Sequence, residues 1–387
     1  MRSAVIVDAI RTPLGRRNGV LRTTHPVELA AVVLRALDER NGLDPSVVDD
    51  VVFGCVMQVG EQAVNVARNA VLAAGWPETV PGTTVDRQCA SGQQATHFAA
   101  QGVIAGAYDV AVAGGVEVMS RVPMGSSMVD GRLGYPFGPV VGARYADVGG
   151  LVPPGMTAEL VAERWNISRD DLDRYAVSSH ERAVRAVTES RFERELIPVV
   201  GARGEVVTAD EGIRPTTLEE LAAFPPIFVP DRGRVTAGNS APITDGAAAL
   251  LVMSEERAAA LGVRPRARFV EFALSGGDPR MMSTASVPAT HEVLARAGLG
   301  LDEIDLIEVD EACASAVLAW QRDTGADLGR VNVNGGAISL GHPLGASGIR
   351  LMVTLLAELE RIGGRFGLQT MGAGGGMATA TIIERLP

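Results

Sequence analysis

Short apolar runs rich in β-branched residues alternate with stretches of small residues along most of this chain. The runs at residues 4–7, 48–54, 304–309 and 366–371 predict strands. The stretches at 93–105 and after residue 345 predict helices made mainly of small residues. Strands that alternate with helices in this way are typical of an α/β fold.

The chain also resembles itself. Residues 89–92 (Cys-Ala-Ser-Gly), a helix, Gly114-Gly115 and a strand are echoed by residues 345–348, a helix, Gly363-Gly364 and the strand at 366–371. Likewise, residues 48–54 mirror residues 304–309. We therefore predict two similar βαβ-rich halves, whose small-residue turns meet at the junction where sheet-based folds usually bind ligands.

The pattern changes between residues 119 and 244. Glycine and proline cluster at 131–154, and a charged amphipathic helix is predicted from 157 through about 191. We interpret 119–244 as an inserted domain. The N-terminal half then comprises 1–118 plus about 245–265, and the C-terminal half comprises 266–387.

Composition narrows the class of protein. A chain of 387 residues with 47% hydrophobic and 21% charged residues can form two or three packed units. No apolar run approaches the ~20 residues that span a bilayer, and the first strand follows without a signal peptide, so we expect a cytoplasmic protein. The three cysteines, Cys55, Cys89 and Cys313, have neither a disulfide framework nor metal-ligand spacing. The C-terminal residues are not a peroxisomal address.

All 35 residues counted as lysine plus arginine are arginine. The absence of lysine excludes Schiff-base chemistry, pyridoxal phosphate anchoring and a Walker-type nucleotide loop. A GC-rich genome explains the arginine bias more simply than a selected function does. The net charge of −11 argues against nonspecific nucleic-acid binding, which depends on a basic surface.

Cys89 lies where the β-branched run at 83–85 stops and the small-residue helix begins. This pattern predicts a nucleophile turn, in which backbone N–H groups and the helix dipole stabilise a thiolate. Ala90, Ser91 and Gly92 leave room for a substrate. The alternative is a buried, inert cysteine.

His342 lies between Gly341 and Pro343, just before the second small-residue helix. This turn suits an imidazole that projects into a cleft, although a structural histidine is the alternative. The glycine run at 372–376 follows a predicted strand, so its N–H groups can approach a ligand as an oxyanion hole or a phosphate cradle. Glycine runs also make ordinary turns.

With these motifs in view, the chain resembles the thiolases, which transfer acyl groups between coenzyme A and a cysteine. Four features occur in the family's order and spacing over essentially the whole length: the Cys-Ala-Ser-Gly turn at 89–92, Asp-Glu-Ala at 310–312, Asn-x-Asn-Gly-Gly-Ala with Gly-His-Pro at 332–343, and the glycine run at 372–376. The resemblance implies a thiolase fold with a layered α-β-α-β-α core. It also implies an acetyl-CoA acetyltransferase or 3-ketoacyl-CoA thiolase with coenzyme A as cosubstrate and no permanently bound cofactor.

The resemblance also implies roles for individual residues. His342 takes the proton of Cys89, which attacks the acyl carbonyl, and the N–H groups of Cys89 and Gly374 stabilise the oxyanion. The inserted domain is expected to cover coenzyme A. Six residues are carried over to that role, although ordinary surface loop is the alternative for them: Arg214, Ala237, Gly238, Ser240, Met156 and Met282.

Two departures from the family fall on the chemistry. Thiolases usually carry a second cysteine, the acid/base for the carbon proton, where this chain has Gly372. The family's Asn-Glu-Ala-Phe motif reads Asp310-Glu311-Ala312-Cys313 here. An ionised Asp310 would repel an enolate that the usual asparagine helps to bind.

Three explanations follow from these departures. Cys313 shuttles the proton in place of the missing cysteine, or it is only a small core residue in place of phenylalanine. Alternatively, the enzyme has lost efficient carbon–carbon chemistry and transfers acyl groups from coenzyme A to water or another nucleophile. The third explanation is a noncatalytic acyl-CoA binder, which would need neither Cys89 nor His342.

The closing segments at 367–371 and 381–385 look most like degradative thiolases of actinobacteria, some of which act on steroid-derived acyl-CoAs. Thiolases form tight dimers or dimers of dimers, so we expect a homodimer or homotetramer. A continuous sheet across the dimer seam is expected at the strand that begins near Val110.

Overall fold

A computed structural model describes residues 2–387, and its centre is one ten-stranded sheet. Nine strands follow the order β10-β11-β12-β9-β1-β8-β5-β3-β4, and β2 pairs with β8. The strands are β1 (Ala4–Arg11), β2 (Gly15–Arg16), β3 (Asp50–Gly54), β4 (Gly82–Val85), β5 (Val110–Val118), β8 (Thr244–Ser254), β9 (Ala267–Gly276), β10 (Leu306–Val309), β11 (Phe366–Ala373) and β12 (Met377–Arg385).

Two halves of this sheet repeat the same arrangement, as the sequence predicts. In the first half, β5 is parallel to β3 and antiparallel to β8; in the second, β11 is parallel to β10 and antiparallel to β12. Only two residue pairs join β1 to β9, Val5 with Arg268 and Ile6 with Ala267. The halves therefore meet at a narrow seam.

One detail of the predicted repeat is wrong. Gly363 ends the helix before β11 in a left-handed conformation, whereas Gly114 and Gly115 lie inside β5. The residue that ends the helix before β5 is Gly106, with φ of 78°. A glycine pair gives no indication of whether its φ is positive, so the sequence alone matched the wrong positions.

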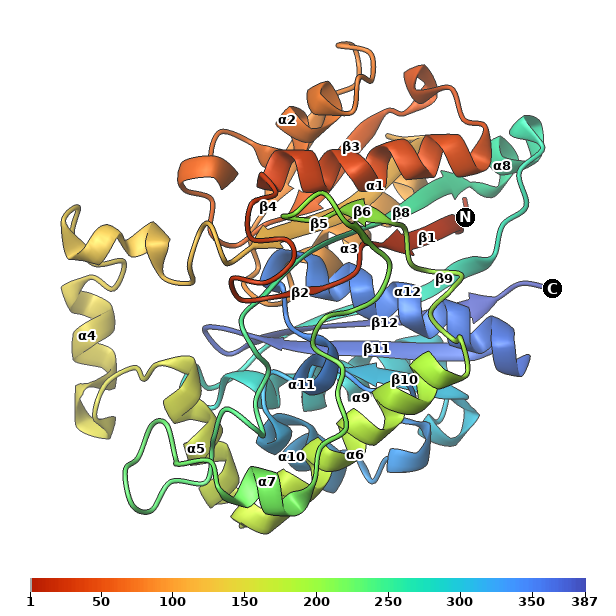
Figure 1. Ribbon diagram of the computed structural model, residues 1–387. Coiled ribbons are helices and arrows are strands. Elements are labelled where there is room, and N and C mark those ends of the chain that lie inside the picture. The colour runs from red at the N-terminus through yellow and green to blue at the C-terminus, as the bar shows by residue number, and fades with distance from the viewer. Residues whose placement is uncertain (1) are drawn as a thin grey trace.

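Helices cover both halves of the sheet and fill the space between them (Figure 1). The outer layer of the first half consists of α1 (Pro26–Asn41) and α2 (Val66–Ala73), and that of the second half of α9 (Ser286–Ala297) and α10 (Ala314–Thr324). The central layer consists of α3 (Ser91–Ala105) and α12 (Leu344–Ile362). This arrangement confirms the expected α-β-α-β-α layering.

Small residues allow α3 and α12 to pack closely against each other. A Cβ atom on Gly92 would lie 2.8 Å from Gly345 O, and one on Gly348 would overlap Gln93 N. Larger side chains at these positions would force the two helices apart. The small-residue stretches of the sequence are therefore the contact that brings the Cys89 turn and the His342 turn together.

Residues 119–243 connect β5 to β8 and contain η3 (Ser126–Gly131), α4 (Pro139–Tyr145), η4 (Ala146–Val148), α5 (Pro154–Arg164), α6 (Arg169–Thr188), β6 (Val199–Val200), β7 (Val206–Val207) and α7 (Leu218–Ala222). The prediction of one helix from 157 through about 191 is wrong. Asn166 has a left-handed φ of 51°, and Ser168 forms a capping box with Asp171 that starts α6. The amphipathic pattern continues across the break, which explains the error.

The predicted dimer seam at Val110 is also wrong, because β5 has β3 on one side and β8 on the other. The strand at that end of the described sheet is β4. No helix within residues 2–387 is long and apolar enough to cross a bilayer. The remaining elements are η1 (Pro45–Val47), η2 (Gly60–Gln62), α8 (Glu255–Leu261), η5 (Met282–Ala285), η6 (Leu301–Glu303), η7 (Leu328–Arg330) and α11 (Ala337–Leu340).

Candidate active site

Cys89 lies in a braced turn between β4 and α3. Gln88 adopts a left-handed φ of 49° and donates its N–H to Asp86 Oδ1 at 2.6 Å. Ser91 Oγ accepts from Arg87 N at 2.8 Å and donates to Gln88 O at 2.6 Å. A non-glycine residue in this region carries strain that its surroundings must hold, a pattern common at functional sites.

The expectation of a stabilised Cys89 thiolate is not met. The helix begins at Ser91, two residues beyond Cys89. Burial, together with the charges of Asp310 and Glu117, raises the pKa of Cys89 to about 12, against the opposing effect of the N–H groups of Cys89 and Gly374. The resting side chain is therefore a thiol, and a base must remove its proton.

His342 has one ring nitrogen anchored and one free. Nδ1 lies 2.7 Å from Ser347 Oγ, which donates its own hydrogen to Pro343 O at 3.0 Å. Ser347 must therefore accept the proton on Nδ1, which leaves the lone pair on Nε2. Nε2 is buried and has no hydrogen-bond partner among the described residues. Thr244 Oγ1 accepts His342 N at 3.1 Å and fixes the backbone.

Asp310 is the neighbour that the two catalytic candidates share. Its Oδ1 lies 3.5 Å from His342 Nδ1, and its charge also affects the Cys89 thiol. The side chain is buried, and Oδ1 has no hydrogen-bond partner within residues 2–387. Burial raises the pKa of Asp310, and the neighbouring His342 and Arg350 oppose that shift. Burial thus makes the ionised form of this carboxyl group less favourable than it is in water, whereas the two cationic neighbours favour it.

Gly372 lies in the last two residues of β11, and Gly374 directly follows the end of that strand. A Cβ atom on Gly374 would lie 3.2 Å from Gln88 Cγ, beside the Cys89 turn. A Cβ atom on Gly372 would overlap Ser283 Cα and lie 2.9 Å from Ser283 Cβ. The segment η5 therefore occupies the space into which a side chain at position 372 would extend.

Cys313 is at the N-terminus of α10, where it is 7% exposed. Its Sγ lies 3.2 Å from Ser315 Oγ, and it packs in the apolar cluster beneath α10. Cys89 packs in a different cluster, with Val56 and Met57. Burial raises the pKa of the Cys313 thiol, and Asp310 adds to the shift. The two cysteines thus share only Asp310 as a common neighbour among these groups.

The structure brings together most of the residues carried over for coenzyme A. Met156 on α5 and Met282 on η5 lie on elements that contact each other. The segment 234–240 joins them, because Glu159 on α5 accepts N–H groups of Arg234 and Val235 at 2.8–2.9 Å. Gly238 is buried, Ala237 is exposed, and Ser240 Oγ donates to Thr236 O.

The side-chain hydrogen bond of Arg214 is to a residue outside that group. Arg214 is exposed, its Nη1 donates to Thr216 Oγ1 at 3.0 Å, and its charge acts on His180 of α6.

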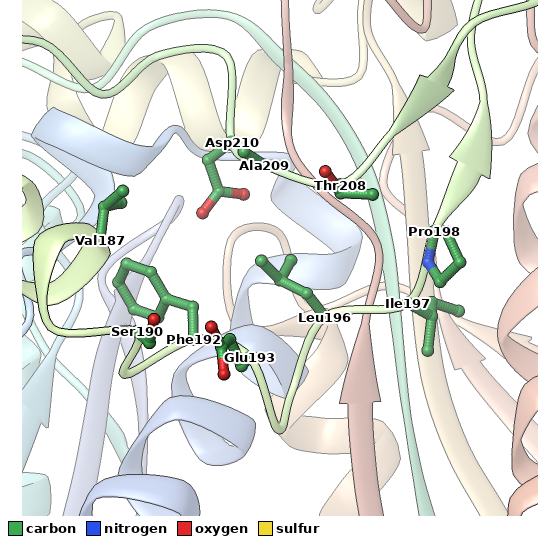
Figure 2. Close-up of a pocket in the computed structure, with 10 residues that line it drawn as sticks. All are labelled: Val187, Ser190, Phe192, Glu193, Leu196, Ile197, Pro198, Thr208, Ala209 and Asp210. Carbon is green, nitrogen blue, oxygen red and sulfur yellow. The ribbon is translucent and has the colours of Figure 1, made fainter.

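The surface cavity in Figure 2, about 290 Å³ in volume, is lined by none of the candidate site residues. It lies around Phe192, Leu196 and Asp210. Asp210 already pairs with Arg11 at 2.7 Å. No cluster of His, Cys, Asp and Glu that could hold a metal ion occurs among residues 2–387.

Sequence reasoning missed three residues that hold the site. Ser347 anchors the imidazole, and Thr244 holds its backbone. Glu117 accepts hydrogen bonds beside Cys89, which its position inside the apolar run of β5 did not suggest. The five-residue spacing from His342 to Ser347 crosses the start of α12, so helical periodicity gives no signal that could have found Ser347.

The comparisons with known proteins agree with this fold and site. Sequence models described as "Thiolase, N-terminal domain" and "Thiolase, C-terminal domain" match residues 4–256 and 263–385. The steroid 3-ketoacyl-CoA thiolase FadA6 of Mycobacterium tuberculosis is 47% identical over 391 residues, covering 100% of this chain and 95% of that protein. A 3-ketoacyl-CoA thiolase of Aliivibrio fischeri is 44% identical over 395 residues, with complete coverage of both.

A solved structure gives the same result. The acetyl-CoA acetyltransferase of Bacillus anthracis superposes with a TM-score of 0.90 at 38% identity, covering 100% of this chain and 99% of that one. Fold and matches together define an α/β protein of the acyltransferase class, in which a cysteine carries the acyl group. The chain belongs to the thiolase family. Members of this family use coenzyme A as a substrate.

Proposed function

We propose that this chain is a degradative 3-ketoacyl-CoA thiolase that works through an acyl-Cys89 intermediate. The observation that supports the proposal most is the arrangement of His342, whose Nδ1 is anchored by Ser347 while Nε2 is free. A buried imidazole with one free nitrogen suits the removal of a thiol proton. The similarity to FadA6 favours degradation, and a steroid-derived acyl-CoA is the substrate class we favour.

The first half-reaction begins from a neutral thiol, because the pKa of Cys89 is raised to about 12. His342 Nε2 takes the proton as the sulfur attacks the 3-keto carbon. Asp310 Oδ1, 3.5 Å from Nδ1, favours the imidazolium that forms. The N–H groups of Cys89 and Gly374, which act on the Cys89 sulfur, are proposed to stabilise the oxyanion.

Collapse of the adduct breaks the carbon–carbon bond and leaves acyl-Cys89 and the enolate of acetyl-CoA. The enolate carbon needs one proton, which balances the proton that His342 took from Cys89. Burial raises the pKa of Asp310, which weakens the repulsion that this carboxyl group would exert on the enolate oxygen. Coenzyme A then takes the acyl group from Cys89.

The carbon proton needs a shuttle, and Cys313 is the residue we propose for it. Both Cys313 and Cys89 are influenced by Asp310, which links the two thiols through one carboxyl group.

The position of Gly372 supports a second candidate function, acyl transfer to water or another nucleophile without efficient carbon–carbon chemistry. Glycine has no side chain that could supply a proton at position 372, and Ser283 occupies the space where one would extend.

The division into two halves and an inserted domain supports a site for coenzyme A between them. We propose that 119–244 covers the cosubstrate, with Met156, Gly238, Ser240 and Met282 along the pantetheine and Ala237 beside them. Arg214 is retained as a phosphate contact only on its charge. We also propose a cytoplasmic homodimer or homotetramer that needs no permanently bound cofactor.

The test is steady-state release of acetyl-CoA from acetoacetyl-CoA plus coenzyme A. Wild type should turn over, and Cys89→Ala should show no turnover above background. Loss of a positioned acid/base typically lowers the rate by about 10²–10⁴, which is the range expected for Cys313→Ala and for His342→Ala. Release of free coenzyme A and acetoacetate without acetyl-CoA would indicate the hydrolase instead.

The Cys313 variant separates the two explanations of the departures. If Cys313 shuttles the proton, Cys313→Ala loses acetyl-CoA formation but Cys89 still becomes acylated. Undiminished thiolysis in Cys313→Ala would remove that role and leave it as a core residue. Binding of acyl-CoA with no turnover in wild type would indicate a noncatalytic binder.

A further inference from the structure

Glu117 is a fully buried carboxylate inside β5 that accepts hydrogen bonds from four N–H groups. Oε2 accepts Val56 N at 3.0 Å and Gly345 N at 2.9 Å, and Oε1 accepts Met57 N at 3.0 Å and Gln62 Nε2 at 2.7 Å. Its exposed fraction is 0%. Hydrogen bonds to both oxygens offset the free-energy cost of burying this carboxylate.

The four donors come from both halves of the molecule. Val56, Met57 and Gln62 follow β3 in the first half, whereas Gly345 lies in the first turn of α12 in the second half. The N-terminus of α12 has Pro343 as its N-cap, without a side-chain cap hydrogen bond. A negative charge near the first N–H groups of a helix supplies such a cap. Glu117 therefore caps α12 from the opposite half.

Three of these hydrogen bonds involve backbone that lies next to the active-site candidates. Gly345 and Ser347 share the first turn of α12, and Ser347 holds His342 Nδ1. Val56 and Met57 pack in the same apolar cluster as Cys89. Glu117 thus holds the turn of α12 that carries Ser347 and orients His342. It also holds the backbone of Val56 and Met57, which pack beside Cys89.

We propose that Glu117 is a positioning residue that sets the placement of His342 relative to Cys89. This inference rests on the proposed function, because it assumes that His342 removes the Cys89 proton. Glu117 touches neither of the two side chains through a hydrogen bond within residues 2–387 and acts through the backbone that carries them.

Only a carboxylate of this length fits the four donors. The amide of glutamine would direct its NH₂ group at two N–H donors, on whichever side it were placed. Aspartate is one methylene shorter and would not reach the donors of both halves. Glu117→Gln is therefore a sharp test, because it preserves volume and removes only acceptor capacity.

The experiment measures the rate of Cys89 alkylation by iodoacetamide from pH 6 to pH 10, with the modified cysteine identified by peptide mass spectrometry. In wild type, Cys89 should react at neutral pH with assistance from His342. In His342→Ala the alkylation rate should instead rise steadily with pH, as expected of a thiol with a raised pKa. The alkylation profile of Glu117→Gln should resemble that of His342→Ala. Its rate at pH 7 should be about 10- to 100-fold lower than that of wild type, which is the size of effect that small displacements of catalytic groups cause.

The control is Asp8→Asn, which changes another buried carboxylate that is held by Arg40, Asn41 and Arg266. Its alkylation profile should coincide with that of wild type, even if its thermal stability falls. Acetoacetyl-CoA thiolysis should show the same contrast, with kcat reduced in Glu117→Gln and KM for coenzyme A nearly unchanged. A merely structural carboxylate would lower stability without moving either readout.

A wild-type profile in folded Glu117→Gln would overturn the inference and leave the proposed function intact. Coincident profiles of wild type and His342→Ala would contradict both. If Glu117→Gln does not fold, Glu117→Asp keeps the carboxylate but is one methylene too short to hold the donors of both halves together. That variant should lower alkylation severalfold at pH 7, and an unchanged rate would also overturn the inference.

Discussion

Restoring a cysteine at position 372 is expected to damage this protein instead of improving it. The family's second cysteine would sit there, so Gly372→Cys is the obvious attempt to restore the proton shuttle. In this chain the added Cβ atom would overlap Ser283 Cα and lie 2.9 Å from Ser283 O. The overlap is with backbone, which cannot rotate away as a side chain can.

The expected loss of stability follows from this overlap. Overpacking costs about 1–3 kcal/mol, and the upper end applies because Ser283 O is held by Ser286 Oγ at 2.7 Å. A loss of about 3 kcal/mol lowers Tm by roughly 5 °C or more in a chain of this size. The assay is thermal unfolding at a fixed scan rate, followed by acetoacetyl-CoA thiolysis.

Two variants separate the overlap from the thiol itself. Gly372→Ala adds only the Cβ atom and should lose most of the same stability. Gly276→Cys, at the end of β9 on the far side of β12, meets no atom within 4 Å and should keep the wild-type Tm. A Gly372→Cys protein with wild-type Tm and raised thiolysis would refute the reasoning.

Three further predictions concern the site and its support. Ser347→Ala removes the acceptor 2.7 Å from His342 Nδ1 and should lower Cys89 acylation by about 10- to 100-fold in a stopped assay, whereas equal rates would show that another group orients the ring. Burial raises the pKa of Glu308 from its ordinary 4.5 to about 8, so its contribution to stability is lost as pH rises through that window. Glu308→Gln should flatten the fall of urea-unfolding free energy between pH 5 and 8, and an unchanged slope would exclude Glu308 as its cause. Gly345→Ala places a Cβ atom 2.6 Å from Gly54 O at the end of β3 and should cost about 1–3 kcal/mol by urea unfolding, while a neutral effect would mean that α12 can move away from β3.

The fold was predictable because its main signals are local. The apolar runs gave the strands, and the self-similarity of the chain gave two equivalent halves. The boundary between α5 and α6 was missed because the amphipathic pattern crosses it, although Ser168 and Asp171 carry a capping signal. The edge of the sheet was missed because strand order depends on contacts distant in sequence.

Only the site residues that belong to recognisable sequence motifs could be predicted. The residues Cys89 and His342 stand out through their turns, but the anchor Ser347 and the cap Glu117 act across elements and leave no local pattern. The protonation state of Cys89 was also beyond the sequence. Helix-start geometry favours a thiolate, whereas burial and Asp310, which depend on the packed structure, favour the thiol.

The most direct test of the account is intact-mass spectrometry of the protein after mixing with acetoacetyl-CoA, with acetyl-CoA release followed at the same time. The protein should carry an acetyl group on Cys89, release one equivalent of acetyl-CoA, and lose the acetyl group when coenzyme A is added. A persistent acetoacetyl group on Cys89 without acetyl-CoA would contradict the proposed mechanism, because acyl transfer would then survive without carbon–carbon cleavage.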